Sequence, residues 1–452
     1  MELDAAARQA VGAALDAGAG DAEVYAQRSA EREVRVHGGG VESLTAATER
    51  GVGVRAWIGG RVGYAYGTDL SDAGLTATSG RAVTAALVAD EDEFAAAPDP
   101  TAREPVTIDG LRDASIDEWP ESRIAELGIA VERAALEADP RIAGVEQAVY
   151  ADSTDQVAIA SSVGGSGRGY ERSTAFAYVQ ALAEGEGARE TGLGFGLARS
   201  PAGLDPGAIG REGAERAVAM IGARKPGSRA CPILFKETVA ASFLGLIASV
   251  LGADTVQRGR SPFADRLGDE VASEALALYD DGLEVNGLQA APFDDEGIAR
   301  RRTPLVEGGR LRTFLHDSYT ARRGDTESTG SAGRSGYRSP PSVSSSNLVV
   351  AEGEASLDEL LGMAGSGVFV TDVAGLHSGV NPVSGVFSVG ASGREIEAGE
   401  LAGPVREFTI ASDLVTMLRG VRAVGGQARW VPFGGSVRTP PLLVGEMTVS
   451  GG

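Results

Sequence analysis

The chain has 452 residues, of which 43% are hydrophobic and 23% are charged, which is the composition of a globular protein with two or three domains. Its formal net charge of −22 disfavours general nucleic-acid binding, because an acidic surface repels phosphate backbones. Only 5% of the residues are aromatic and 64 are glycine, which favours a β-rich or mixed fold over a helical bundle.

The N-terminal part combines two predicted helices with a predicted antiparallel sheet. Residues 3–17 form the first predicted helix, with apolar side chains on one stripe and Gly18 as a stop. Glycine turns at 38–40 and 59–60 separate segments in which apolar and polar residues alternate. The predicted strands are 22–29, 32–37, 41–46, 51–58 and 61–66, and the second predicted helix is 71–87. We expect residues 1–90 to form an α/β domain with a mostly antiparallel sheet.

A polar, proline-containing segment at 90–105 has the composition of a linker. A helix is predicted for 121–138 and another for 205–222, the latter with Asp205 as N-cap and Pro206 in the first turn. Between these helices, the predicted strands are 145–151, 156–162, 169–184 and 192–198. We expect residues 91–225 to form a middle domain.

From residue 226 onward the pattern changes to short strands with long Gly-, Ser- and Pro-rich connections. One apolar helix is predicted, from 237 to about 252. The densest loop is 324–347, and so long a loop within a compact domain is often functional. We expect residues 226–452 to form a β-rich C-terminal domain, which makes the whole chain an α+β protein.

The chain lacks the common signatures of catalytic and cofactor sites. Its three histidines, at 37, 316 and 377, form no close pair, and there is no Cys-x-x-Cys, so we predict neither a metal site nor a cofactor in this chain. His316, Asp317 and Ser318 are the residue types of a serine-hydrolase triad, but adjacent residues cannot face one another as a triad requires, and no Gly-x-Ser-x-Gly is present. Residues 192–196 alternate glycine along a strand, which indicates a close backbone approach and not a nucleotide loop.

The sequence also indicates the compartment. Cys231 is the only cysteine, which excludes an intramolecular disulfide and agrees with a reducing environment. The acidic first residues match neither a signal nor a transit peptide, and the longest apolar run, 239–253, is shorter than the ~20 residues that span a bilayer. We expect a soluble, cytoplasmic protein that binds no membrane.

The segment 231–263 reads CPILFKETVAASFLGLIASVLGADTVQRGRSPF, and it resembles the central segment of the TldD/TldE (PmbA-like) peptidase family. TldD-type members carry a His-Glu-x-x-x-His zinc motif at the start of the helix. By this resemblance, Lys236 occupies the first His position, Glu237 the Glu position and Ala241 the second His position. A charged lysine and an alanine do not ligate zinc, and residues 430–447 lack the Cys that is a further ligand in the zinc-bearing type.

Other segments are similar to the same family. They are DAEVY at 21–25, GVGVRAW at 51–57, LHDSYTAR at 315–322 followed by STG at 328–330, VFVT at 368–371, and GVNPVSGVFSVGASG at 379–393. The last is the most specific, because several fixed spacings coincide within it.

The resemblance implies a TldE-type chain that is not catalytic itself. Such a chain pairs with a TldD-type zinc subunit, and the heterodimer encloses a chamber in which peptides or unfolded segments are cleaved. Two alternatives remain open: a stand-alone, homodimeric peptide-binding or scaffold protein, and a metal-independent hydrolase that uses Ser318, Glu237 or Lys236.

The resemblance also suggests which residues face the substrate. We expect Lys236 and Glu237 to face the chamber, with helix capping or a buried ion pair as the alternative. A polar segment is expected to line the substrate path, with hydrogen bonding within the loop as the alternative for each residue. These candidates are Asp317, Ser318, Arg322, Ser328, Thr329 and Arg334.

Overall fold

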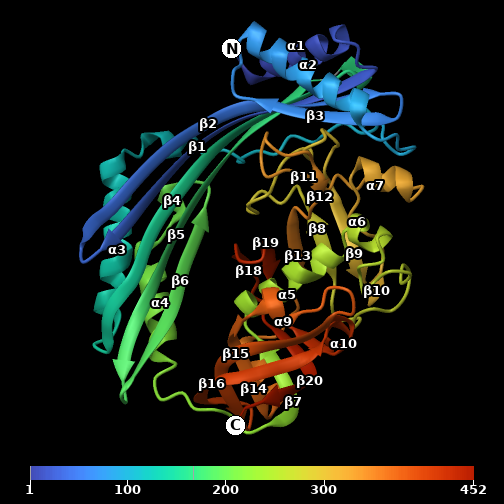
Figure 1. Cartoon of the computed structure of the whole chain (residues 1–452). Coiled ribbons are helices and arrows are strands. Elements are labelled where there is room, and N and C mark those ends of the chain that lie inside the picture. Colours follow the sequence, from blue (N-terminus) through green and yellow to red (C-terminus); the bar gives the residue numbers. More distant parts are fainter. Residues whose placement is uncertain (1, 166, 452) are drawn as a thin grey trace.

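The computed structural model describes residues 2–165 and 167–451. It contains a long curved sheet, here called sheet A, which partly surrounds a β-rich C-terminal lobe formed by residues 229–450 (Figure 1). The lobe lies on the concave side of sheet A. This arrangement confirms the predicted α+β class.

Sheet A has six strands in the order β3-β2-β1-β4-β5-β6, and all of its pairings are antiparallel. The predicted domain boundary between residues 90 and 91 falls in the connection between β3 and β4. The strands on both sides of this boundary nevertheless share one sheet, because β1 pairs with both β2 and β4. The strands are β1 (Asp21–His37), β2 (Gly40–Ile58), β3 (Arg61–Gly67), β4 (Ile142–Ser161), β5 (Gly167–Gly185) and β6 (Ala188–Ala198).

The strands of sheet A are longer than the sequence predicted. β1, β2 and β4 each join two predicted strands into one continuous strand of 17 to 20 residues, so the predicted breaks within them were wrong. In β2, residues 40–50 are exposed on both faces, and no alternation of apolar and polar residues is needed there. The predicted glycine turns are confirmed, with φ of 62° at Gly38 and 55° at Gly59.

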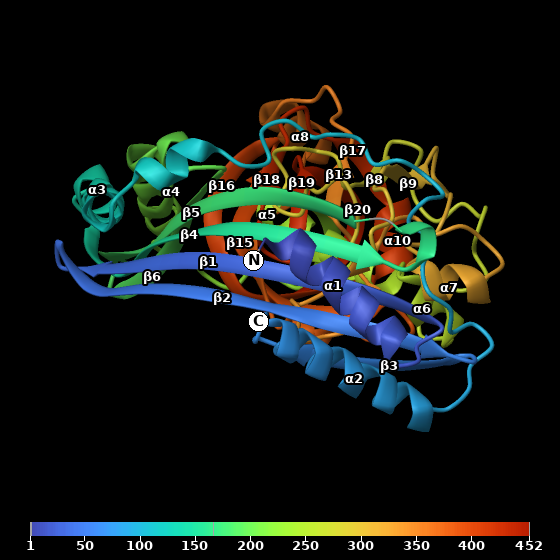
Figure 2. The ribbon, with the colours of Figure 1, turned by 90° about the horizontal axis from the view of Figure 1, so that it is seen from above.

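Four helices cover the convex face of sheet A, in two pairs at opposite ends of the long strands (Figure 2). All four were predicted, and Ser71 and Asp205 cap two of them through hydrogen bonds to backbone N–H groups. Gly194 lets one helix approach, since a Cβ there would lie 2.0 Å from the carbonyl oxygen of Ile209. The helices are α1 (Leu3–Asp16), α2 (Asp72–Val88), α3 (Glu121–Ala138) and α4 (Pro206–Val218).

The C-terminal lobe contains two six-stranded sheets around one core. The first sheet, in the order β10-β9-β8-β13-β19-β18, consists of β8 (Leu278–Asp281), β9 (Arg302–Glu307), β10 (Arg310–Leu311), β13 (Asn347–Val350), β18 (Arg429–Val431) and β19 (Ser436–Thr439). The second is barrel-like, because β16 pairs with β20 as well as with β15. It consists of β7 (Arg229–Phe235), β14 (Gly367–Ala374), β15 (Val386–Glu397), β16 (Glu400–Asp413), β17 (Val421–Val424) and β20 (Leu442–Ser450).

The predicted apolar helix is α5 (Glu237–Val250), which packs against strands of both sheets in the centre of the lobe. The predicted loop at 324–347 contains the short strands β11 (Ala332–Gly333) and β12 (Ser342–Val343). The remaining helices are α6 (Ala253–Gln257), α7 (Ser318–Arg323), α8 (Leu357–Ala364), α9 (Leu376–Gly379) and α10 (Leu414–Arg419), with short 3₁₀ turns at Ala114–Glu118, Val163–Gly165 and Pro201–Gly203. No helix within the described parts of the chain has the length and apolar character needed to cross a membrane.

Candidate functional site

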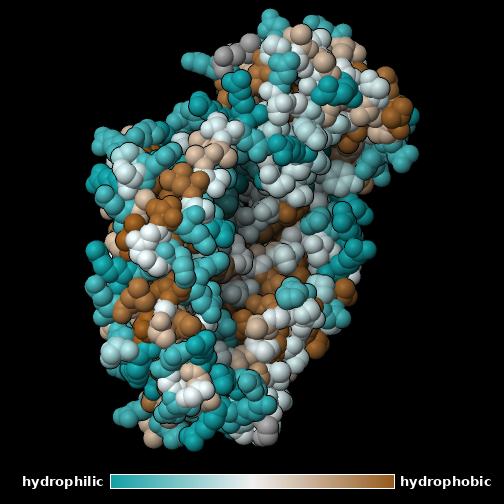
Figure 3. All heavy atoms as spheres, turned by 60° about the vertical axis from the view of Figure 1, so that its left-hand side comes forward, coloured by the Kyte–Doolittle hydropathy of each residue, from teal (hydrophilic) through white to brown (hydrophobic). Residues whose placement is uncertain are grey.

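A cavity of about 790 Å³ lies where the edge strand β6 and helix α4 face the barrel-like sheet and the start of α5. Its walls combine charged, hydroxyl-bearing and apolar side chains. The charged residues that line it are Glu190, Glu215, Arg216, Lys236, Asp372, Arg394 and Arg406. The space-filling view in Figure 3 shows the surface hollowed between sheet A and the C-terminal lobe. A recess of this size is typical of ligand sites.

Lys236 enters this cavity because β7 ends one residue before it and α5 begins one residue after it. The Lys236 N–H donates to the carbonyl oxygen of Val370 at 3.0 Å, which fixes the backbone where strand becomes helix. The Lys236 side chain is 19% exposed and lines the cavity. Its partner in the motif, Glu237, occupies the first helical position.

An ion-pair cluster surrounds Lys236 and Glu237. The carboxylate of Glu237 lies 3.7 Å from the guanidinium of Arg216 and 4.0 Å from the ammonium of Lys236. Glu212 accepts hydrogen bonds from both Arg216 and Arg429, and Arg429 stacks over the ring of Phe195 at 4.0 Å. This cluster couples α4 and β18 to the start of α5.

Lys236 and Asp372, which both line the cavity, have shifted pKa values. Burial, followed by the positive charge of Arg216, lowers the pKa of Lys236 to about 8. Burial raises the pKa of Asp372. Both shifts favour the neutral form, as expected for groups withdrawn from water.

Ala241 is fully buried in the core of the lobe and lies outside the lining of the cavity. A Cβ on Gly434 would lie 3.3 Å from the Ala241 carbonyl oxygen, so the chain around Gly434 passes close over this part of α5. Within residues 2–165 and 167–451, no three His, Cys, Asp or Glu side chains are grouped as a metal ion requires. The motif positions do not fit zinc, because an ammonium group has no free electron pair and alanine has no donor atom.

The candidate substrate-path residues lie elsewhere in the lobe, and none of the six lines this cavity. Asp317 caps α7 through a capping box with Thr320, and the Ser318 N–H donates to Glu296 at 2.9 Å. Ser328 donates to the carbonyl oxygen of His316 at 3.1 Å, and Thr329 accepts from the His316 N–H at 2.7 Å. These contacts organise the loop itself.

Arg322 and Arg334 reach further and join separate parts of the fold. Arg322 donates to the carbonyl oxygens of Phe94 at 2.9 Å and Ala96 at 2.7 Å, which fastens the predicted linker to α7. The Arg334 side chain is fully buried and donates to Glu23 of β1 at 2.8 Å. It also borders a polar cavity of about 380 Å³ on the concave side of sheet A.

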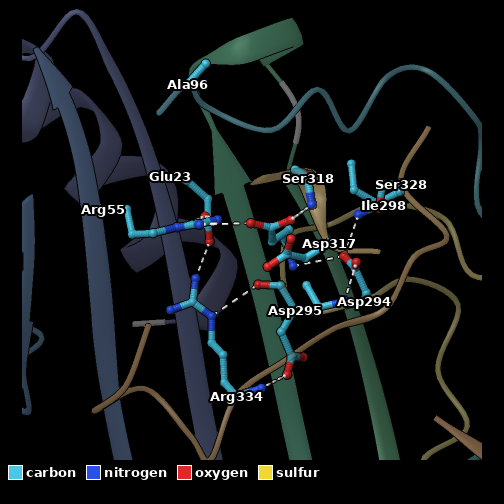
Figure 4. A network of polar contacts seen from close by, with 12 residues as sticks. Glu23, Arg55, Ala96, Asp294, Asp295, Ile298, Asp317, Ser318, Ser328 and Arg334 are labelled. Carbon is cyan, nitrogen blue, oxygen red and sulfur yellow. Dashed lines mark hydrogen bonds and ion pairs between the residues drawn. The ribbon is translucent and has the colours of Figure 1, made fainter. Parts of the chain in front are cut away.

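Glu23 is the centre of a buried polar network that links sheet A to the C-terminal lobe (Figure 4). It accepts from Arg334 of the lobe and from Arg55 of β2, and Arg55 also donates to Glu296 of the lobe at 2.9 Å. Asp294 and Asp295 extend the network by accepting backbone N–H groups of the loop that contains Arg334.

Sequence reasoning located Lys236 and Arg334 but missed the residues around them. Arg216, Asp372, Arg394 and Arg406 come from α4, β14, β15 and β16, which are distant in the sequence and have no shared motif. Glu23 could have been suspected, because it stands inside the otherwise apolar stretch at residues 22–26.

Comparisons with known proteins place the chain among peptidase-like relatives. Three family models match successive parts of it: PmbA/TldA metallopeptidase domain 1 at residues 22–86, the central domain at 114–221 and the C-terminal domain at 228–451. The Metalloprotease PmbA of Escherichia coli O157:H7 is 28% identical over 98% of this chain and 96% of its own length. A Metalloprotease TldD homolog from Buchnera aphidicola is 24% identical over 44% of each chain.

Two solved structures share the fold. A protein of Thermotoga maritima, described as a candidate modulator of a DNA gyrase, superposes with a TM-score of 0.90 at 25% identity, over 99% of this chain and 100% of that one. TldE from Thermococcus kodakarensis superposes with the same TM-score over the same shares, and its 21% identity makes this a likeness of fold alone.

Proposed function

Because the chain belongs to the PmbA/TldA metallopeptidase family, we propose that it is the non-catalytic subunit of a TldD/TldE-type peptidase. The observation that carries the proposal is the pair of residues at the ligand positions of the zinc motif. Lys236 brings a positive charge to the first position, and Ala241 is buried in the core at the second. Zinc belongs to the partner in this proposal, a paralogue with an intact His-Glu-x-x-x-His motif.

Glu237 has no catalytic role in this proposal. A general base in a metallopeptidase acts on a metal-bound water, and the nearest charged groups to Glu237 are the cations of Arg216 and Lys236. Its carboxylate neutralises charge at the start of α5. The contribution of this chain is to bind and position the substrate while the partner supplies the activated water.

The substrates are peptides and unfolded protein segments, in a heterodimer that works in the cytoplasm. Strand edges such as that of β6, which ends sheet A beside the large cavity, support this assignment. A strand edge pairs with the backbone of an extended peptide and so tolerates varied side chains.

Co-purification with the zinc-motif paralogue tests the proposal. We expect the two chains to form a complex that cleaves an unstructured peptide, and a chelator to abolish the cleavage. Replacing Glu by Gln in the paralogue's motif should abolish activity, whereas Glu237→Gln in this chain should leave cleavage in place. Comparing these two Glu-to-Gln variants shows which subunit carries out the peptide cleavage.

Two results would contradict the proposal. Chelator-insensitive cleavage by this chain alone, lost in Glu237→Gln, would identify a metal-independent hydrolase. A stable homodimer that binds peptide and ignores the paralogue would identify a stand-alone scaffold.

A further inference from the structure

We propose that the cavity beside Lys236 receives the C-terminal carboxylate of a peptide, with the Lys236 ammonium as its counter-ion. This inference rests on the proposed function and extends it, since it names the part of the substrate that this chain holds.

Within the described residues, Lys236 differs from the other cations of the cavity, because its ammonium makes only a long ion pair, at 4.0 Å with Glu237. Arg394 donates to the carbonyl oxygen of Ala402 through Nε and Nη2, at 3.0 and 2.7 Å. Arg406 pairs with Glu190, and Arg216 donates to the carbonyl oxygen of Leu193 at 2.6 Å and pairs with Glu212. Among the described residues, the Lys236 ammonium donates no hydrogen bond, because its nearest carboxylate, Glu237, is 4.0 Å away. A second polar atom here, Nε of Arg216, is buried without a partner.

The walls of the cavity match a peptide terminus in chemistry. One ammonium group balances one negative charge, which suits a carboxylate better than a multiply charged phosphate. Around it are apolar side chains and hydroxyl groups that suit a peptide's side chains and backbone amides. These residues are Leu193, Val239, Phe369, Phe433, Thr191, Thr238, Ser242 and Thr371.

The acidic groups around the cavity leave room for this anion. Glu190 and Glu212 are paired with arginines, and Glu215, which also lines the cavity, is exposed to solvent. Asp372 faces the same cavity, and burial raises the pKa of its carboxyl group. On a chain with a net charge of −22, a recess lined by the Lys236 ammonium is a distinctive place for an acid to bind.

The chain has only two lysines, Lys225 and Lys236, and Lys225 is exposed, so a matched control exists. Binding of a labelled, unstructured peptide with a free C-terminus should be compared with that of its C-terminal amide by fluorescence anisotropy. We expect the acid to bind wild type and Lys225→Met about tenfold more tightly than the amide, and this preference to disappear in Lys236→Met. Equal binding of acid and amide, a preference that survives in Lys236→Met, or no binding of the acid would overturn the proposal.

A second measurement needs no variant. Lysine acetylation of the unmodified chain, followed by mass spectrometry, should show that the peptide acid slows acetylation of Lys236 and leaves Lys225 unaffected, while the amide protects neither. Equal protection by acetate at the same concentration would assign the site to small carboxylates instead. Both measurements use this chain alone, so their failure is distinguishable from a failure to form an active complex with the paralogue.

Discussion

At Lys236, the cost of burying a charge should appear as a pH dependence of stability. Its pKa of about 8 in the folded protein lies below the usual 10.5, so the unfolded chain holds the proton more tightly. The free energy of unfolding should therefore rise as the pH increases from 8 to 10.5, and the full penalty, about 3 kcal/mol, applies below pH 8. The neighbouring charges are Arg216, Arg429, Glu212 and Glu237.

Lys236→Met removes that penalty, so we expect the variant to be more stable than wild type by about 2 kcal/mol near neutral pH. The difference should shrink to nearly zero above pH 10.5. Urea denaturation at several pH values measures it, and the exposed Lys225→Met should differ from wild type by less than about 0.5 kcal/mol. A constant difference across the pH range would contradict the assignment of the titration to Lys236.

Ala241→His tests whether the second ligand position has been filled by the core. We expect a loss of about 2–4 kcal/mol in the free energy of unfolding, because an imidazole must displace packed side chains and would be buried without a partner. Thr238→His, on the same helix but lining the cavity, should cost less than about 1 kcal/mol. Thermal or urea denaturation distinguishes them, and equal stability would mean that position 241 has room for a ligand.

For individual residues, the sequence predicted which residues stand at the motif positions better than it predicted which side chains surround them. The motif comparison correctly located Lys236 and Glu237 at the start of a helix, because that comparison runs along the chain. It could not predict that Arg216 and Asp372 lie in the same cavity, since only the packing of α4 and β14 around α5 brings them together.

At the scale of elements, the network around Glu23 joins β1 and β2 to the C-terminal lobe. Glu23→Gln should lower the free energy of unfolding by about 3–5 kcal/mol, because two buried guanidinium groups lose their counter-charge. Glu33 lies on the same strand and pairs with Arg35 on the surface, so Glu33→Gln should cost at most about 1 kcal/mol. Denaturation by urea compares the two, and similar losses would show that burial of the network contributes little.

The same elements show where sequence patterns succeed. Helices α1 to α4 were predicted because capping residues and glycine stops act locally. The long strands were divided in the prediction, because residues 40–50 of β2 lie outside the core and show no alternation of apolar and polar residues. The segment around Asp317 and Arg334 was predicted to line a substrate path, and its hydrogen bonds tie the lobe together and fasten it to sheet A.

At the scale of the whole molecule, the linker at 90–105 is held against the lobe by Arg322. Removing this side chain in Arg322→Ala should increase the rate of tryptic cleavage after the exposed Arg103 by about three- to tenfold, because two hydrogen bonds to the linker backbone are lost. Arg323→Ala, which alters the adjacent exposed residue, is the control and should cut at the wild-type rate. Equal rates in both variants would show that other contacts suffice to hold the linker.

The α+β class follows from composition and local patterns, whereas the sharing of one sheet by two predicted domains does not. β1 pairs with β4, which lies far along the chain, and the residue pattern of either strand alone does not indicate its partner.

That pairing sets the order in which the molecule can be completed during synthesis. Ser29 and Asp155 meet across β1 and β4 although 126 positions separate them. While the ribosome is still making the linker, β1 and β2 form a hairpin with an open edge, and a nascent chain in this state is a target for chaperones and for aggregation. Folding of sheet A is therefore expected to be slow, and the complete sheet can form only after the segment with β4 to β6 has left the ribosome.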